Sequence, residues 1–143
     1  MHEFSDLEAA ARDLATSRRL DLRVTTGQFG VATLADVDGV QRELYLAFDE
    51  EDGRGLLPVP RFFWKVLHDP AAGRATAFVG INNPHLTQIA ADDFICANVC
   101  NRVPWVDWTL DNARRGYMYC CTAAELRAAI PYAPDLGDVD LLV

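Results

Sequence analysis

Apolar residues recur along the first segment of the chain at the three- and four-residue spacing of one helix face. The residues on this face are Leu7, Ala11, Leu14 and Ala15. The pattern predicts a helix from Ser5 to about Arg18. Ser5 is a suitable N-cap, and Glu8 three residues later completes a capping box. We therefore expect the helix to begin at Ser5.

The central part of the chain has the alternation and β-branched composition of strands. Strands are predicted over 22–34, 42–49, 61–69 and 75–82, the first with a bend or bulge at its glycines. Short connections favour antiparallel pairing, so these four segments are expected to form one antiparallel sheet. The acidic segment 50–55 is predicted to be a loop.

The last third mixes irregular and helical segments. Residues 88–104 are expected to be irregular, and 109–117 to form a short helix that ends at Gly116. Thr122 and Glu125 form a second capping box, which predicts a helix to about Ile130. The predicted class is α+β, an antiparallel sheet flanked by helices, in a single domain over 1–143.

Composition restricts the kind of protein. Half of the 143 residues are hydrophobic, which is incompatible with disorder. Charges, glycines or prolines interrupt every apolar run, so no membrane partner is expected, and no signal peptide is apparent.

The net charge of −8 disfavours nucleic-acid binding unless a basic surface exists locally. The only local basic cluster is diluted by Asp13 and Asp21, and it consists of Arg12, Arg18, Arg19 and Arg23. If any surface contacts phosphate, we expect it to be this one, although a solvated helix face is the favoured explanation for Arg18 and Arg19.

All four cysteines lie in the last third: Cys96, Cys100, Cys120 and Cys121. Adjacent cysteines rarely bond to each other, so two bridges linking the first pair to the second are predicted, in either pairing. Bridges indicate an oxidising compartment. The alternative, a zinc site, usually has C-x2-C spacing, which this chain lacks.

Common catalytic motifs are absent: the chain has no phosphate-binding Gly loop, nucleophile elbow or H-E-x-x-H. His68 is predicted at a strand end and His85 in a loop, neither with the setting of a catalytic base. Trp64 alternates with Phe62 and Val66, which favours core packing over base stacking. Trp105 and Trp108, close to the cysteines, are expected to cover the disulfide region.

Several segments together resemble one known family. "VPRFFWKVLHDP", "AFVGINNP", "WVDW" and "GYMYCC" are similar, in this order, to the C-terminal half of the DNA/RNA non-specific endonucleases. The resemblance is to the arthropod branch, which includes secreted and gut enzymes that degrade double-stranded RNA. "FSDLEAAARDL" and "TTGQFGVATL" fit the same family, so the resemblance spans nearly the whole chain.

The resemblance implies the ββα-metal fold and Mg²⁺-dependent hydrolysis of DNA and RNA phosphodiesters. The family's W-x-x-L-E-x-x-x-R helix matches here with Phe4 in place of Trp, which gives catalytic roles to Glu8 and Arg12. Glu8 is then expected to reach Mg²⁺ only through a bound water, and Arg12 to steady the phosphate.

Two parts of the family's site have no counterpart. The D-R-G-H motif that supplies the general base is absent, and the metal-binding Asn would fall just before Met1. The chain is therefore expected to be a C-terminal portion that is inactive alone, in which Glu8 caps the helix and pairs with Arg12. A non-catalytic, disulfide-stapled binding module is the alternative. An exposed sheet edge could also support a homodimer.

Overall fold

The computed structural model describes residues 2–107 and 116–143. The elements are α1 (His2–Arg18), β1 (Arg23–Val31), β2 (Thr33–Ala35), β3 (Gln41–Glu43), β4 (Tyr45–Phe48), β5 (Gly55–Pro58), β6 (Pro60–Asp69), β7 (Arg74–Ile81), the short 3₁₀ turns η1 (Ala91–Asp93) and η2 (Cys100–Arg102), β8 (Met118–Cys121), α2 (Ala123–Ala129) and β9 (Asp140–Leu141). The α+β class with antiparallel sheets is confirmed.

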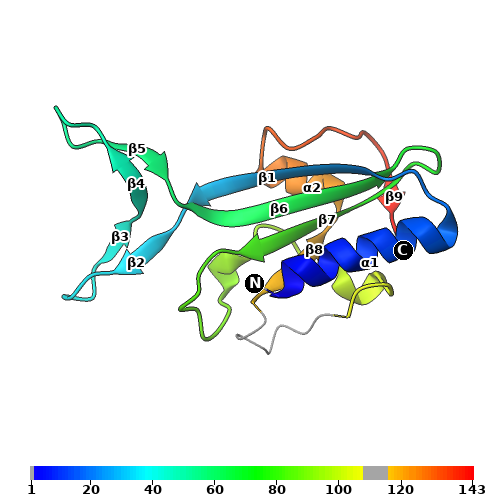
Figure 1. Ribbon diagram of the computed structural model, residues 1–143, viewed down its shortest axis with the longest axis horizontal. Coiled ribbons are helices and arrows are strands. Elements are labelled where there is room, and N and C mark those ends of the chain that lie inside the picture. Colours follow the sequence, from blue (N-terminus) through cyan, green and yellow to red (C-terminus); the bar gives the residue numbers. More distant parts are fainter. Residues whose placement is uncertain (1, 108–115) are drawn as a thin grey trace.

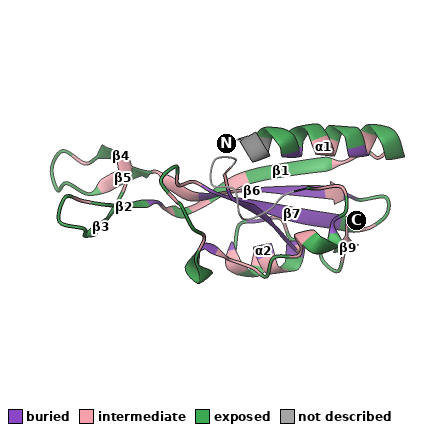
Figure 2. Cartoon of the chain, turned by 90° about the horizontal axis from the view of Figure 1, so that it is seen from below, coloured by how far each residue is buried: buried purple, intermediate pink, exposed green. Residues whose placement is uncertain are grey.

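The main sheet has the order β1-β6-β7-β8, all antiparallel, and β9 pairs in parallel with β7. Figure 1 shows α1 lying along this sheet, and Figure 2 shows α1 and α2 on its opposite faces. Alternation along β6 produces the two faces, because Trp64 and Val66 pack on the α2 side whereas Leu67 packs on the α1 side. The predicted core role of Trp64 is confirmed.

The prediction that 42–49 is a strand of the main sheet is wrong. This segment breaks at Leu44 into β3, which pairs with β2, and β4, which pairs with β5. At the break the backbone changes partners, since Leu44 N–H donates to Ala32 and Leu44 C=O accepts from Val59. The result is an arm, residues 33–58, that projects from one end of the body (Figure 1). The main sheet takes β8 as its fourth strand instead.

The first predicted helix boundary is also wrong. Helix α1 begins at His2, so Ser5 lies inside it and cannot cap its start. The second capping prediction is confirmed at its main contact, because the Thr122 hydroxyl accepts a hydrogen bond from the Glu125 N–H at the start of α2. The predicted helix over 109–117 and the position of Trp108 lie outside the described residues, apart from 116 and 117.

Two disulfides join β8 to the irregular segment beside it. Cys96 bonds Cys121, and Cys100 bonds Cys120, which confirms that the two pairs are cross-linked. Trp105 packs with the cluster that holds Cys120 and donates its indole N–H to the Leu142 carbonyl, as expected for a residue that covers this region.

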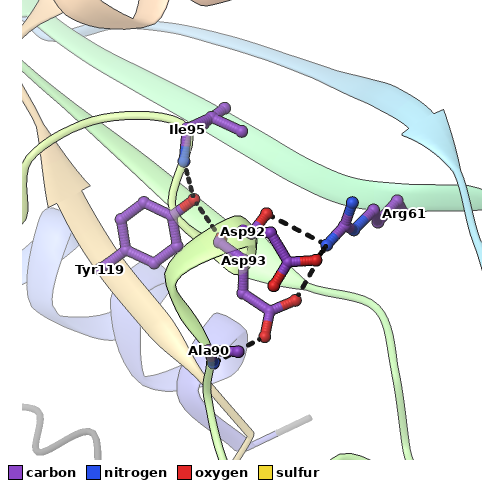
Figure 3. A network of polar contacts seen from close by, with 6 residues as sticks. All are labelled: Arg61, Ala90, Asp92, Asp93, Ile95 and Tyr119. Carbon is purple, nitrogen blue, oxygen red and sulfur yellow. Dashed lines mark hydrogen bonds and ion pairs between the residues drawn. The ribbon is translucent and has the colours of Figure 1, made fainter.

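A polar network fixes the segment between β7 and β8 to the sheet (Figure 3). Arg61 on β6 forms ion pairs with Asp92 and Asp93. The Tyr119 hydroxyl donates to the Asp93 carbonyl and accepts from the Ile95 N–H. Burial of this hydroxyl raises the pKa of Tyr119 to about 12. The network satisfies polar groups that would otherwise be buried without partners.

Candidate active site

Helix α1 presents one apolar face to the sheet and leaves its charged residues at the flank. Leu7 and Leu14 are buried against Leu67 and Phe78, which confirms the predicted helix face. Glu8 follows Leu7 directly, so its side chain is at the edge of this contact, and Arg12 lies one helical turn further on. The helix therefore places both predicted catalytic side chains beside β6.

Glu8 is held by a residue of the sheet. Its Oε1 accepts a hydrogen bond from Lys65 Nζ at 2.9 Å. The Lys65 side chain is only 7% exposed, while that of Glu8 is 57% exposed. The hydrogen bond from Lys65 is the main reason that the pKa of Glu8 lies below its ordinary value, followed by the positive charge of Lys65 and, more weakly, that of Arg12.

The prediction that Glu8 caps the helix and pairs with Arg12 is therefore wrong in both parts. Glu8 is inside α1, and its ion pair is with Lys65. A buried ammonium is costly without a partner. The Glu8 carboxylate therefore pairs with the buried Lys65 in preference to the exposed guanidinium of Arg12.

A cavity of about 440 Å³ opens between α1, the start of β1 and β6. Charged side chains line it together with the apolar flank of the helix and sheet: Glu8, Arg12, Asp21, Lys65, Ala11, Ala15, Leu20, Leu22, Val24 and Leu67. The lining thus combines two cations, Arg12 and the buried Lys65, with two carboxylates, Glu8 and Asp21, in a partly apolar hollow.

The other predicted phosphate contacts do not line this cavity. Arg18, at the end of α1, donates to the Val143 carbonyl. Arg19 follows with a left-handed φ of 54°, and Arg23 begins β1 opposite His68. Glu8 and Arg18 are ten positions apart on the helix, roughly 15 Å along its axis. Arg12 thus lines the same cavity as Glu8, whereas Arg18, Arg19 and Arg23 are not among the residues that line it.

The two histidines of the described strands and loops lie away from this cavity as well. His68 is half-buried near the end of β6, and His85 is exposed in the loop after β7. Neither lines the cavity. A second cavity of about 340 Å³, at the base of the arm, is lined by neutral amides and the Arg61 network without a histidine.

The donor set does not fit direct Mg²⁺ coordination. In residues 2–107 and 116–143 no three His, Cys, Asp or Glu side chains are grouped as a metal would require. Glu8 forms an ion pair with Lys65, so its carboxylate is suited to contact a metal-bound water but not to coordinate the metal by itself. Among the same residues no helix is long and apolar enough to cross a membrane.

Sequence reasoning missed Lys65 as a member of this group. Its signal was visible, since it is the only lysine of the chain and interrupts the apolar run "RFFWKVLHD". A charged residue within a buried strand requires a partner. The partner could not be named without knowing that α1 crosses the same face of β6.

Comparison with known proteins identifies relatives of this chain. The family model for DNA/RNA non-specific endonuclease matches residues 2–126. The chain belongs to this family. The match includes α1, the strands β1, β6, β7 and β8 of the main sheet and both disulfides.

Two curated relatives extend the comparison. The chain is 31% identical over 122 residues to "Salivary endonuclease" of Lutzomyia longipalpis, an alignment that covers 83% of this chain and 27% of the relative. It is 27% identical over 116 residues to "Salivary protein Tsal1" of Glossina morsitans morsitans, covering 81% and 28% respectively. The chain thus spans little more than a quarter of the length of these relatives. No solved structure matches it significantly.

Proposed function

We propose that this chain is a single domain that forms the C-terminal part of the catalytic unit of an endonuclease that hydrolyses phosphodiester bonds of DNA and RNA. The observation that carries the proposal is the cavity in which the family's Glu-x-x-x-Arg pair, Glu8 and Arg12, shares one wall with Lys65. Family membership and the name of the sand-fly relative support the same activity.

Each charged residue has a chemical role in this proposal. The Arg12 guanidinium binds a phosphodiester oxygen and stabilises the charge that develops on it during hydrolysis. The Glu8 carboxylate accepts hydrogen bonds at the same site. Arg18, Arg19 and Arg23 extend the positive surface along the nucleic-acid backbone.

Mg²⁺ is the proposed cofactor, by family. When bound, it would supply charge neutralisation at the phosphate. Because the described residues do not fit direct coordination, the primary ligand and the general base are proposed to come from a part of the full-length protein that precedes residue 1. Glu8 is proposed to act on the metal only through water.

The proposed location is extracellular. Two disulfides are typical of an oxidising compartment, and both curated relatives are named as salivary proteins. Dimerisation through the outer edge of β1, whose residues are mostly exposed, is also proposed, and gel filtration can test it.

The experiment that tests the function uses the purified full-length gene product with plasmid DNA and double-stranded RNA, with and without EDTA. Hydrolysis of both substrates that EDTA abolishes is expected, and Glu8→Gln or Arg12→Met should reduce kcat by on the order of a hundredfold. Full activity in these variants would refute the site assignment. Inactive wild-type protein would refute the nuclease proposal.

The 143-residue chain is proposed to be inactive when produced alone. If it instead binds nucleic acid tightly without cleaving it, the alternative of a disulfide-stapled binding module is favoured. That binding would weaken steeply with salt if phosphate contacts dominate.

A further inference from the structure

Lys65 is a buried cation in a position that the strand pattern assigns to the α1 side of the sheet. Its neighbours Trp64 and Val66 belong to the core on the α2 side, while Lys65 extends to the opposite face beneath α1. The strand is paired on both sides, opposite Thr26 and Phe78, so the position of the amine is fixed by two ladders. The carboxylate of the more exposed Glu8 reaches this amine and accepts its hydrogen bond.

The helix itself offers Glu8 a different partner. Glu8 and Arg12 are four residues apart, the spacing at which glutamate and arginine pair on a helix surface. Within the described part of the chain the Arg12 guanidinium makes no hydrogen bond or ion pair, and Arg12 is exposed and lines the cavity. Lys65 therefore takes the hydrogen bond of the Glu8 carboxylate, and Arg12 interacts with that carboxylate only more weakly, through its charge.

We propose that Lys65 is a positioning residue of the site: it binds Glu8, and this keeps the Arg12 guanidinium available for the substrate phosphate. The inference rests on the proposed nuclease function. Lys65 does not contact substrate in this arrangement, because its side chain is covered by α1 and the sheet. Its contribution is to set where the carboxylate lies and to stop the Glu8–Arg12 pair from forming.

The kinetic test uses the full-length gene product and a short fluorogenic oligonucleotide. Lys65→Met releases Glu8 to pair with Arg12, so KM should rise and kcat fall, each by on the order of tenfold. In the double variant Lys65→Met/Glu8→Gln the carboxylate of residue 8 is gone and cannot pair with Arg12, so KM should return to within about twofold of wild type while kcat stays low. Lys65→Arg should restore most of both values.

The matched control is Arg42→Met, which removes another ion pair, with Asp36, far from the cavity on the arm. It should leave both constants unchanged. Constants within about twofold of wild type in Lys65→Met, or a KM that the double variant fails to restore, would overturn the inference.

A second measurement separates this inference from the proposed function. In the 143-residue chain, the NMR resonance of Arg12 Nε–H should move in Lys65→Met and exchange more slowly with water, and should return in the double variant. An unchanged Arg12 resonance in folded Lys65→Met overturns the inference even if the enzyme is active. Inactive wild-type enzyme with the expected NMR response refutes the nuclease function instead, and with it the role of Arg12 toward phosphate.

Discussion

The body and the arm of this molecule are built from the same kinds of strand but bury them very differently. In the body, β7 is buried along nearly its whole length, between β6 and β8 and between two helices. In the arm, β2 to β5 form two-stranded sheets whose residues are almost all exposed. Large apolar side chains such as Leu46, Phe48 and Leu57 remain in solvent there.

The comparison shows where a functional site can be held firmly. A residue on β6 is fixed by a paired strand on each side, so Lys65 can bind Glu8 in one defined geometry. The arm has no second layer, and an isolated two-stranded hairpin is only marginally stable. It carries seven acidic and two basic residues, which disfavours any contact with phosphate on the arm itself.

The largest difference between body and arm should come from the disulfides, which lie only in the body. Replacing all four cysteines by serine should cost about 2–5 kcal/mol for each bridge removed, enough to unfold the body at 37 °C. Thermal unfolding with and without reductant measures the loss. An unchanged midpoint after complete reduction would show that the core alone holds the body together.

Leucine truncations should separate the two regions next. Leu67 is completely buried, and Leu67→Ala should lower the free energy of unfolding by about 2–5 kcal/mol. Leu46 is 73% exposed, and Leu46→Ala, the matched control on the arm, should change stability by no more than about 0.5 kcal/mol. Urea titration compares them. A large loss in Leu46→Ala would mean that the arm is covered in solution.

Two glycines provide a finer comparison, because a methyl group at either would overlap an aromatic ring. At Gly27 the ring is that of the buried Trp64, and at Gly55 that of the half-buried Tyr45. Gly27→Ala should cost about 1–3 kcal/mol, since the indole cannot move without disturbing the core. Gly55→Ala should cost less, because the phenol can turn into solvent. Equal losses by chemical denaturation would contradict the contrast.

The smallest effect is expected at alkaline pH. The pKa of Tyr119 is raised from 10.0 to about 12, mainly by burial, and that of Tyr45 is raised mainly by its hydrogen bond to Glu43. Between pH 10 and about pH 12 the Tyr119 hydroxyl is deprotonated in the unfolded chain but still protonated in the folded one. The free energy of unfolding should therefore fall as the pH rises through this range. Tyr119→Phe should flatten this dependence, while Tyr45→Phe should leave it nearly unchanged. Stability measured across this range in each variant decides the point.

Much of the body could be predicted from local pattern. The strands over 61–69 and 75–82, the face of the first helix and the Thr122 cap depend on residues close together in sequence. The arm could not be predicted in this way, because the alternating pattern of 42–49 suits a strand of the main sheet as well as the two short strands of the arm. Only the backbone junction at Leu44 redirects it.

The candidate site, like the fold, could be predicted only where it depends on local spacing. The Glu8 and Arg12 spacing placed both residues on one helix flank, but their partners were predicted wrongly. A capping box requires a helix that begins at Ser5, and helix α1 begins earlier. Lys65 stands 57 residues from Glu8, so no local pattern connects the two.

The sequence by itself determined the α+β class, the family of the chain and the cross-linking of the two cysteine pairs, since each follows from residue types and short spacings. Only the tertiary structure decided the disulfide pairing, the departure of the arm and the partner of Glu8. These depend on which elements meet across the sheet. Contacts between distant elements are determined by the simultaneous burial of many side chains, which no short stretch of sequence specifies.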